Sequence, residues 1–366
     1  MKDFTLRNDT KLLFRAEPLD DLAAVLEGKR VLVVYGGGSA KTNGCYDDVI
    51  RAVSKAGGTL FELGGASREM VSIEQGIRSA KGNRVDLILG AGGASVMDCA
   101  KLIAFGSRHE DDLWDYIKGN KDPYGQPRLP LILMPTYPSS GSEYGLGAVA
   151  ADARTGEFGT AYGIAADVAV LTPKYSLSLD AEMTAYTGLV TLVQLCASTL
   201  GDRNPVSYDI DISVIRNVLK AARTLKEFPA NLDARAVILY GAAISTSSRL
   251  GLGKEEGYAY ELYEVEFLPE VLFGAAYRKS LTTVFPRFLN AMGKYHGEEI
   301  SRFLRDAFGY EGTIEEATQK MVELFTELGV DMCFDGAVSE ELIRPVEIST
   351  SFTLKELESI IEDCIR

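Results

Sequence analysis

The chain has 366 residues, of which 46% are hydrophobic and 25% are charged, and its net charge at pH 7 is −14. This length and apolar content predict two domains with sizeable cores, and the negative charge argues against nucleic acid or an anionic membrane surface as a partner. The apolar runs are too short to span a membrane, residues 1–5 lack the apolar core of a signal peptide, and the five scattered cysteines are typical of reduced thiols, so we expect a cytoplasmic protein.

Short apolar runs alternate with amphipathic segments over the first 134 residues. The apolar runs predict strands at residues 30–35, 59–63, 86–89 and 129–134. The amphipathic segments predict helices at residues 19–26, 46–56, 73–80 and 95–105. Such alternation indicates βαβ units with a parallel sheet, in which ligands bind at the carboxyl ends of the strands.

Two of the expected strands run into glycine-rich turns. Gly36, Gly37 and Gly38 follow the first of these strands, and Gly92 and Gly93 follow the run that starts at Asp86. A strand, a glycine turn and a helix together point free backbone N–H groups at an anion. The alternative is an ordinary turn that binds nothing, because the second turn does not match the GxGxxG pattern.

The pattern of the chain changes in its second half. A hydroxyl-rich loop covers residues 135–143, and short strands are expected at 149–151 and 168–171. Helical periodicity then begins with an apolar stripe at 186–200, and further helices are expected at about 211–227, 233–249, 258–273, 276–292, 297–307, 313–328 and 353–365. We therefore expect an α/β domain at residues 1–172 and an all-helical domain at 173–366, with an active-site cleft between them.

Four motifs together carry a resemblance to a known family. They are VLVVYGGGSAKTNG at 31–44, GGASVMD at 92–98, the loop with Pro135-Thr136 and SGSE at 140–143, and Leu171-Thr-Pro173. In this order and spacing they resemble the iron-containing alcohol dehydrogenase family, especially its butanol dehydrogenase and aldehyde reductase branch. The resemblance covers about residues 1–330.

The resemblance implies a fold and a reaction. The fold is a Rossmann-like dinucleotide-binding domain followed by an all-α domain, as in dehydroquinate synthase. The reaction is hydride transfer between a nicotinamide cofactor and a small alcohol or aldehyde, in a protein expected to be a homodimer. The alternative is a catalytically inactive protein of the same fold that binds a cofactor or metabolite, since fold does not fix function.

The resemblance also assigns cofactor residues in the second turn. Gly92, Gly93 and Ser95 would hold the pyrophosphate, and Asp98 would lie near the nicotinamide. The residues expected to border the adenine or a phosphate are Thr136 and Ser139.

The first turn bears on the choice between NADP and NAD. Its candidate cofactor residues are Gly37, Gly38, Ser39 and Lys41. An acid at a strand end bonds the ribose 2′-hydroxyl of NAD and repels a 2′-phosphate, but Tyr35 leads into this turn without an acid. We therefore expect NADP, with NAD as the alternative, and a solvated surface lysine as the alternative role of Lys41.

Family members hold a divalent metal with one Asp and three His, whereas this chain has only His109 and His296. The four ligand positions of the family fall here at Val190, Gln194, Tyr263 and Tyr277. A further active-site His of the family falls at Phe267. We therefore expect no divalent metal in this chain.

Tyr263 and Tyr277 are the candidate catalytic residues. A Tyr hydroxyl can donate a hydrogen bond or a proton to a developing alkoxide, whose charge the metal would otherwise stabilise. The alternative is that both rings fill the emptied pocket as packing. The acidic side chains of the same region, Glu261, Glu264, Glu266 and Glu270, are expected to form a solvated face, with an all-oxygen site for Mg²⁺ or Mn²⁺ as the alternative.

Overall fold

The structure is a computed structural model that describes residues 3–202, 204–247, 250–254 and 258–366. It divides into two compact units. The α/β unit comprises Leu6–Leu179 and Ala242–Ser248, and the helical unit comprises Met1–Thr5, Asp180–Gly241 and Arg249–Arg366. The first change of unit follows a 3₁₀ helix at Pro173–Ser178.

A six-stranded sheet forms the centre of the α/β unit. Its strand order is β1-β8-β5-β4-β2-β3, and every pair of neighbours is parallel. The strands are β1 (Lys11–Phe14), β2 (Arg30–Tyr35), β3 (Thr59–Leu63), β4 (Leu87–Gly92), β5 (Leu131–Pro135) and β8 (Val168–Leu171). The structure thus confirms the parallel α/β architecture expected from the alternating pattern.

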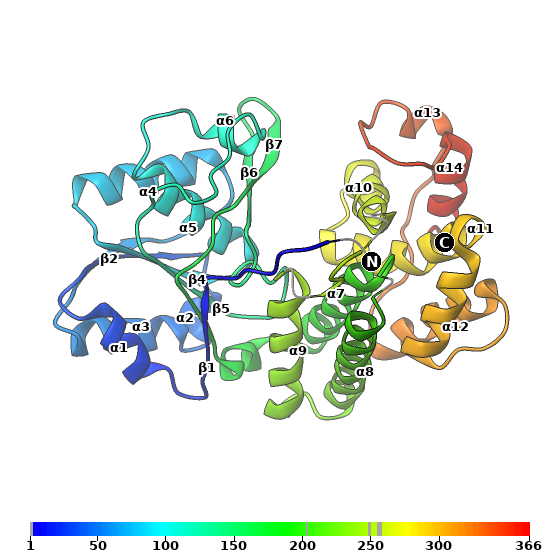
Figure 1. Cartoon of the computed structure of the whole chain (residues 1–366), viewed down its shortest axis with the longest axis horizontal. Helices are drawn as coiled ribbons and strands as arrows, with labels where there is room; N and C mark the ends of the chain where they lie inside the picture. The colour runs from blue at the N-terminus through cyan, green and yellow to red at the C-terminus, as the bar shows by residue number, and fades with distance from the viewer. Residues whose placement is uncertain (1–2, 203, 248–249, 255–257) are drawn as a thin grey trace. The chain divides into compact units, whose positions relative to one another are not determined.

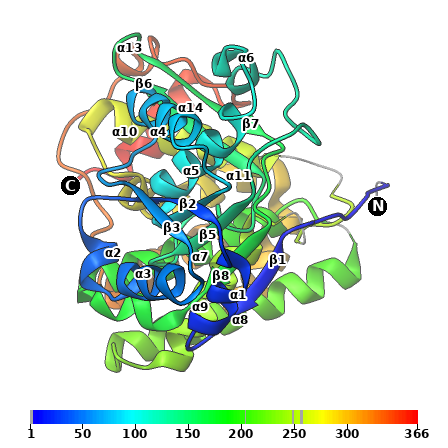
Figure 2. The same cartoon turned by 90° about the vertical axis from the view of Figure 1, so that its left-hand side faces the viewer.

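Consecutive side chains of the central strands enter two separate cores. Leu32 and Ile88 pack with residues of α4 (Met70–Gly82) and α5 (Ala94–Gly106), whereas Val33 and Leu89 pack with residues of α1 (Leu19–Leu26) and α3 (Cys45–Lys55). Figures 1 and 2 show these two pairs of helices on opposite faces of the sheet. Because both faces are covered, the strands read as unbroken apolar runs.

Some elements of the α/β unit are not predicted by the sequence. Strand β1 has four residues and pairs only with β8, so its apolar pattern is too short to stand out. Strands β6 (Gly147–Asp152) and β7 (Glu157–Tyr162) form an antiparallel hairpin, of which the sequence predicts only a short strand. The sequence also does not predict the short helices α2 (Ser39–Thr42) and α6 (Leu113–Ile117).

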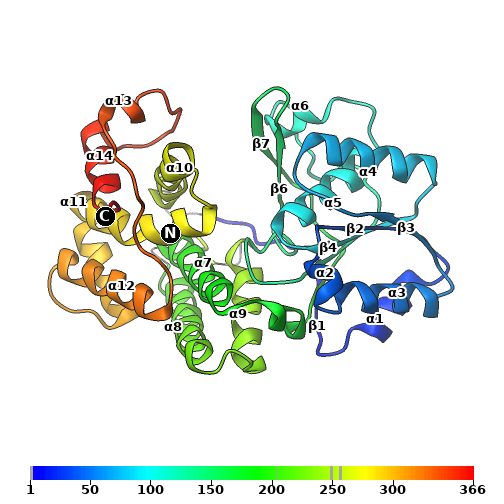
Figure 3. The same cartoon turned by 180° about the vertical axis from the view of Figure 1, so that it is seen from behind.

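The helical unit is organised around α7 (Ala181–Thr199), which packs against α8 (Pro205–Glu227) and α11 (Tyr277–Phe308). The remaining helices are α9 (Leu232–Ser245), whose residues from Ala242 on belong to the α/β unit, α10 (Glu261–Phe273), α12 (Ile314–Leu328), α13 (Glu340–Ile343) and α14 (Leu354–Glu362). Figure 3 shows α10, α11 and α12 in this unit, and α11 packs against both α10 and α12. None of the described helices is both long enough and apolar enough to cross a bilayer.

All five cysteines are free, and four of them are buried: Cys45, Cys99, Cys196 and Cys364. Burial raises the pKa of each of these four thiols, to about 12 for Cys99 and Cys364. Cys333 is the partly exposed one.

Candidate functional site

The second glycine turn joins the buried strand β4 to α5. Val96 and Met97 donate their backbone N–H groups to the carbonyl of Gly93 and so begin the helix. A Cβ on Gly93 would lie 2.3 Å from the Tyr137 hydroxyl oxygen, and one on Gly92 would lie 2.7 Å from the Val96 side chain. A side chain at either position would have to displace Tyr137 or Val96, so glycine fits this turn best.

The hydroxyl-rich loop after β5 is fastened to this turn and to α5. Thr136 N–H donates to the carbonyl of Gly92 at 3.0 Å, and Ser142 Oγ donates to Asp98 Oδ1 at 2.6 Å. Lys101 Nζ donates to the carbonyls of Gly145 and Gly147 at 2.9 and 2.7 Å. One face of α5 therefore positions the loop that contains the candidate residues Thr136 and Ser139.

Three ionisable side chains are buried behind this loop, and burial shifts all of their pKa values. Desolvation lowers the pKa of Lys101 to about 8, an effect that the charges of Asp98 and Glu143 oppose. Desolvation also raises the pKa of Glu143 to about 7 and raises the pKa of Asp98. Lys101, which is 0% exposed, is the cation that makes burial of these two carboxyl groups tolerable.

The first glycine turn lies beside the second at the carboxyl edge of the sheet. Tyr35 at the end of β2 pairs with Ala91 of β4, and a Cβ on Gly36 would lie 3.2 Å from Val96 Cγ2. Gly37 and Gly38 have open space where a Cβ would project, so their backbone is accessible. The structure thus brings the two candidate phosphate turns together, as their place on parallel strands predicts.

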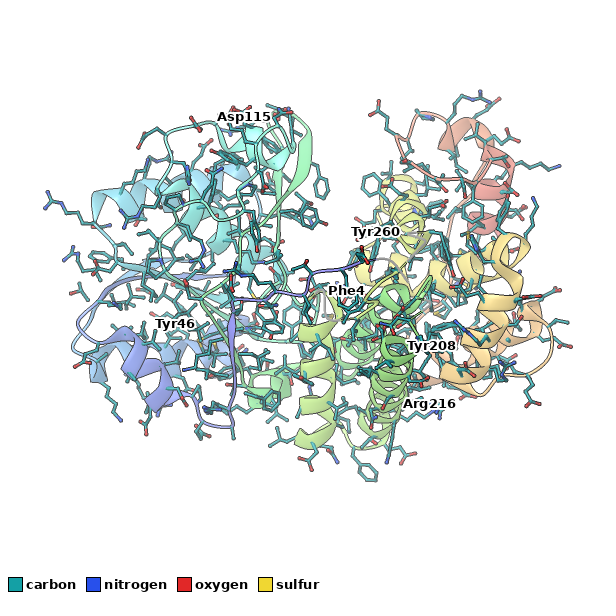
Figure 4. The ribbon with its side chains drawn as sticks, viewed as in Figure 1. Phe4, Tyr46, Asp115, Tyr208, Arg216 and Tyr260 are labelled. Atoms are coloured by element: carbon teal, nitrogen blue, oxygen red, sulfur yellow. The ribbon has the colours of Figure 1, made fainter. Side chains whose placement is uncertain are left out.

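Lys41 is held by aromatic rings. Its Nζ lies 4.8 Å from the ring centres of both Tyr35 and Tyr46. Tyr46, labelled in Figure 4, donates its hydroxyl to Glu62 Oε1 at 2.5 Å, and this hydrogen bond raises the pKa of Tyr46 to about 12. Lys41 is therefore a positioned cation beside the first turn, in a cation–π arrangement.

A nicotinamide dinucleotide fits the chemistry of these residues. Gly37 and Gly38 of the first turn allow close approach to their backbone, and Thr136 Oγ1 is buried without a hydrogen-bond partner. Ser95 Oγ accepts a hydrogen bond from the backbone N–H of Arg68, which orients that hydroxyl at the start of α5. The individual roles of the candidate cofactor residues stay predictions.

A second polar cluster lies within the helical unit, on α7, α10 and α11. Gln194 Nε2 on α7 donates to the Tyr277 hydroxyl at 3.4 Å. Gln194 is 3% exposed, and its Oε1 has no hydrogen-bond partner. Burial raises the pKa of Tyr277, and nearby Tyr263 and Glu266 raise it further. The two candidate tyrosines therefore affect each other's ionisation. Tyr277 also contacts Gln194, which is another of the four positions aligned with metal ligands of the family.

Val190 and Phe267, the remaining positions aligned with active-site residues of the family, are apolar. Val190 is buried on α7 at 4% exposure, which makes it part of the apolar core. Phe267 is 40% exposed on α10.

The acidic residues of α10 do not form one solvated face, which corrects the expectation from the sequence. Glu261 accepts hydrogen bonds from Thr350 and Ser351, and Glu264 accepts one from the backbone of Ser349. Glu266 is 4% exposed, and its Oε2 has no hydrogen-bond partner. Burial and the neighbouring Glu270 raise the pKa of Glu266 well above its usual value.

Val190, Gln194, Tyr263 and Tyr277, where the resemblance places the metal ligands of the family, are not the ligand types that its ion requires. Valine cannot ligate, and an amide and two phenols are poor substitutes for an aspartate and three histidines. Within the described ranges, no group of three or more His, Cys, Asp and Glu side chains is placed to hold a metal. His109 lies 2.8 Å from the carbonyl of Pro127 in the α/β unit, and His296 stacks on Tyr258 at a kink of α11.

Sequence reasoning missed the buried ionisable residues Lys101, Glu143 and Glu266. For Lys101 a signal exists, because a lysine three residues after Asp98 lies in a helix whose other residues are almost all apolar. Glu143 and Glu266 lie among polar residues, so nothing in the local pattern marks them as buried.

Known proteins match this chain along its length. The family model described as "Iron-containing alcohol dehydrogenase" matches residues 9–176. The chain is 29% identical over 301 residues to "Probable NADH-dependent butanol dehydrogenase 1" of Bacillus subtilis (strain 168), covering 79% of this chain and 76% of that protein. It is 25% identical over 390 residues to "NADPH-dependent aldehyde reductase YqhD" of Escherichia coli (strain K12), covering 100% and 98%.

Solved structures extend the match to the fold. The structure of NADH-dependent butanol dehydrogenase A from Thermotoga maritima matches with a TM-score of 0.88 at 23% identity, covering 100% of this chain and 99% of that one. The shared fold is the Rossmann-like unit followed by the helical unit described above. The α/β half of the chain therefore matches the iron-containing alcohol dehydrogenase family, and the whole chain shares the fold of this solved structure.

Proposed function

We propose that this protein is an NADP(H)-dependent oxidoreductase that interconverts small aldehydes and alcohols without the iron of its family. The observation that carries the proposal is the pair of glycine turns at the carboxyl edge of the sheet, where Gly37 and Gly38 have open space beside their backbone and Thr136 Oγ1 is buried without a partner. Both features suit a seat for a dinucleotide. The names of the relatives, which are butanol dehydrogenases and aldehyde reductases, support the substrate class.

The first turn supports NADP over NAD. Lys41 is a cation held beside the rings of Tyr35 and Tyr46 next to that turn, and it would pair with the 2′-phosphate of a nucleotide bound there. Glu62 is an acid close to these rings, and its carboxylate accepts a hydrogen bond from Tyr46. NAD is the alternative, since relatives are named for NADH as well as NADPH.

Bound nicotinamide would supply the hydride, and the residues of the chain would bind and supply a proton. The glycine turns would hold the phosphates through backbone N–H groups. The Tyr277 hydroxyl would donate a hydrogen bond to the substrate oxygen and then a proton to the alkoxide. Its raised pKa keeps the hydroxyl protonated at neutral pH, and Gln194 orients it. Tyr263 would line the same pocket.

The test begins with metal-stripped protein titrated with NADPH and then with NADH, read by fluorescence. Saturable binding of NADPH, followed by its oxidation with a panel of short aldehydes, is the expected result. A chain that binds neither nucleotide would contradict the proposal.

The competing function is a cofactor- or metabolite-binding protein without catalysis. Val190 favours it, because a core valine stands where the family places a charged ligand. The same titration separates the two, since the inactive protein would bind NADPH but oxidise none of it with any aldehyde of the panel.

A further inference from the structure

Two segments of the helical unit that lie apart in the sequence meet in a short parallel β-bridge. The bridge pairs Phe334, which follows α12, with Ile365, which follows α14. Phe334 donates its backbone N–H to the carbonyl of Cys364 at 2.7 Å, and Arg366 donates its own to the carbonyl of Phe334 at 3.1 Å. In this parallel register the two preceding residues, Cys333 and Cys364, lie opposite each other on one face.

Helix α11 packs against both α12 and α14 and holds the two segments in register. The guanidinium of Arg287 on α11 donates to the carbonyl of Met332 at 3.2 Å and to the carbonyl of Asp363 at 3.3 Å. Met332 and Asp363 are the residues that directly precede the two cysteines. One helical turn before Arg287, the Thr283 hydroxyl donates to the carbonyl of Asp331 at 3.5 Å. One planar side chain therefore fixes the backbone beside both cysteines.

The spacing across the bridge suits a covalent link between the two side chains. Neighbouring strands lie about 4.8 Å apart. The Cα atoms that a disulfide joins lie about 4.4 to 6.8 Å apart. The other three cysteines, Cys45, Cys99 and Cys196, lie on three different helices, α3, α5 and α7. Of the five cysteines, all of which the structure describes, Cys333 and Cys364 are therefore the two that backbone pairing places opposite each other.

The two thiols differ in their access to solvent. Cys333 is partly exposed, whereas Cys364 is buried and donates its thiol to the carbonyl of Ile360 at 3.3 Å. Burial raises the pKa of Cys364 to about 12, an effect that the charge of Arg287 opposes. Because oxidants attack the thiolate, Cys364 is protected from direct oxidation. Cys333 is therefore the thiol that a small oxidant reaches first.

We propose that Cys333 and Cys364 are a reversible redox pair, which hydrogen peroxide converts into a disulfide that locks the segment at 364–366 to the segment at 333–334. In the resting protein both residues are free thiols. The link would close residues 333–364 into a covalent loop that contains α13 and α14. The pair lies wholly within the helical unit and is independent of the proposed oxidoreductase reaction.

The oxidation balances with hydrogen peroxide as the oxidant. The Cys333 sulfur attacks one peroxide oxygen, the O–O bond breaks, and a sulfenic acid forms while the thiol proton leaves in a first water. The Cys364 sulfur then attacks the Cys333 sulfur, the S–O bond breaks, and the hydroxyl leaves with the Cys364 proton as a second water. The two sulfurs together lose two electrons, which the two peroxide oxygens gain. A dithiol reductant reverses the link by thiol–disulfide exchange.

The first experiment treats the full, reduced chain with hydrogen peroxide, blocks the remaining thiols and analyses the digested protein by mass spectrometry. The expected product is a peptide containing Cys333 linked to a peptide containing Cys364, and dithiothreitol should separate them. Cys333→Ala should abolish the link, whereas Cys99→Ala, which removes a buried thiol of the α/β unit, should leave it unchanged. Two outcomes would overturn the redox pair: a sulfinic or sulfonic acid at Cys333 without the link, or a dimer joined through Cys333.

The second experiment measures what the link does to the folded chain. A disulfide that closes a loop of this length restricts the unfolded chain, so the linked wild type is expected to melt about 5 °C or more above the reduced wild type. Cys333→Ala and Cys364→Ala should each melt at the same temperature with and without peroxide. If the linked and the reduced wild type melt together, the disulfide does not lock these segments.

The third experiment tests Arg287 as the positioning residue of the pair. Arg287→Lys keeps the positive charge but has no planar group that reaches both carbonyls. Disulfide formation in this variant is expected to slow about tenfold, and the sulfenic acid of Cys333, trapped with dimedone, should accumulate instead. Arg305→Lys is the control on the same helix, because Arg305 pairs with Asp306 on the surface. An unchanged rate of disulfide formation in Arg287→Lys would contradict the positioning role.

Discussion

Gly93 and Tyr137 approach each other so closely that a Cβ on Gly93 would lie 2.3 Å from the Tyr137 hydroxyl oxygen. Gly93→Ala must therefore displace the Tyr137 ring from the second turn. We expect NADPH affinity to fall about tenfold or more, with a loss of stability of about 1 to 3 kcal/mol from overpacking. Gly82→Ala is the control, because a Cβ there meets nothing within 4 Å. Fluorescence titration and thermal melting of both variants measure the effect, and unchanged binding by Gly93→Ala would remove this turn from the cofactor site.

Replacement of Lys101 by methionine should destabilise the α/β unit strongly. The variant keeps most of the side-chain volume but leaves the carbonyls of Gly145 and Gly147 without their donor and the carboxyl groups of Asp98 and Glu143 without a cation. The expected loss is about 3 to 5 kcal/mol in the free energy of unfolding, measured with denaturant. Lys121→Met, at an exposed ion pair, should change little. A small effect at Lys101 would mean that water replaces its hydrogen bonds.

Glu143 should make the stability of the protein depend on pH. Its pKa is raised from 4.5 to about 7 in the folded protein, so between these values the folded state keeps a proton that the unfolded state releases. The free energy of unfolding therefore falls as the pH rises through this window, by roughly 2 to 3 kcal/mol from this group. Glu143→Gln should remove that part of the fall, as seen in denaturant curves at pH 5 and pH 8. Parallel pH dependence in both proteins would contradict the buried acid.

Lys41 should control the choice of cofactor. Lys41→Ala is expected to weaken NADPH about tenfold or more, because a charge-assisted contact to the 2′-phosphate is lost, and to leave NADH unchanged. The measurement is the ratio of the two dissociation constants. Lys55→Ala is the control, since Lys55 pairs with Asp20 on the surface. Equal weakening of both nucleotides would assign Lys41 to the shared part of the cofactor instead.

Tyr277→Phe should lower kcat for aldehyde reduction about 100-fold or more, with NADPH binding retained. Tyr263→Phe should lower kcat less, because Tyr277 is the hydroxyl that Gln194 contacts. A chelator should leave the wild-type rate unchanged. If both variants keep full activity, the tyrosines are packing residues, and if the chelator abolishes activity, the reaction uses a metal.

The sequence predicts the α/β half well because its signals are local. Strands β2 (RVLVVY) and β4 (LILGAG) are buried on both faces. A strand of this kind is a continuous apolar run, so it can be recognised without knowing which strands it pairs with. The turns that follow contain the glycines that the close contacts with Tyr137 and Val96 require. Strand β1 escapes prediction because its role depends on β8, which lies far along the chain.

The helical cluster could be predicted only as a set of aligned positions. The sequence locates Tyr277 and Gln194, but it cannot tell that a hydrogen bond joins them across α7 and α11. It also treats the glutamates of α10 alike, although Glu261 and Glu264 contact the segment at 349–351 and Glu266 is buried. Helical spacing alone does not say which of four acids faces inward, because that depends on the helices packed against it.

Because four of the five cysteine thiols are buried, the folded chain can be labelled selectively at the fifth. Thiol reagents attack the thiolate, and the raised pKa values of Cys45, Cys99, Cys196 and Cys364 keep these thiols protonated and shielded. Cys333 in the helical unit is the partly exposed cysteine, so a maleimide fluorophore should attach there in folded protein without any engineering. The same reagent would also follow unfolding over time, because each further equivalent of dye bound reports that one of the four buried cysteines has become exposed.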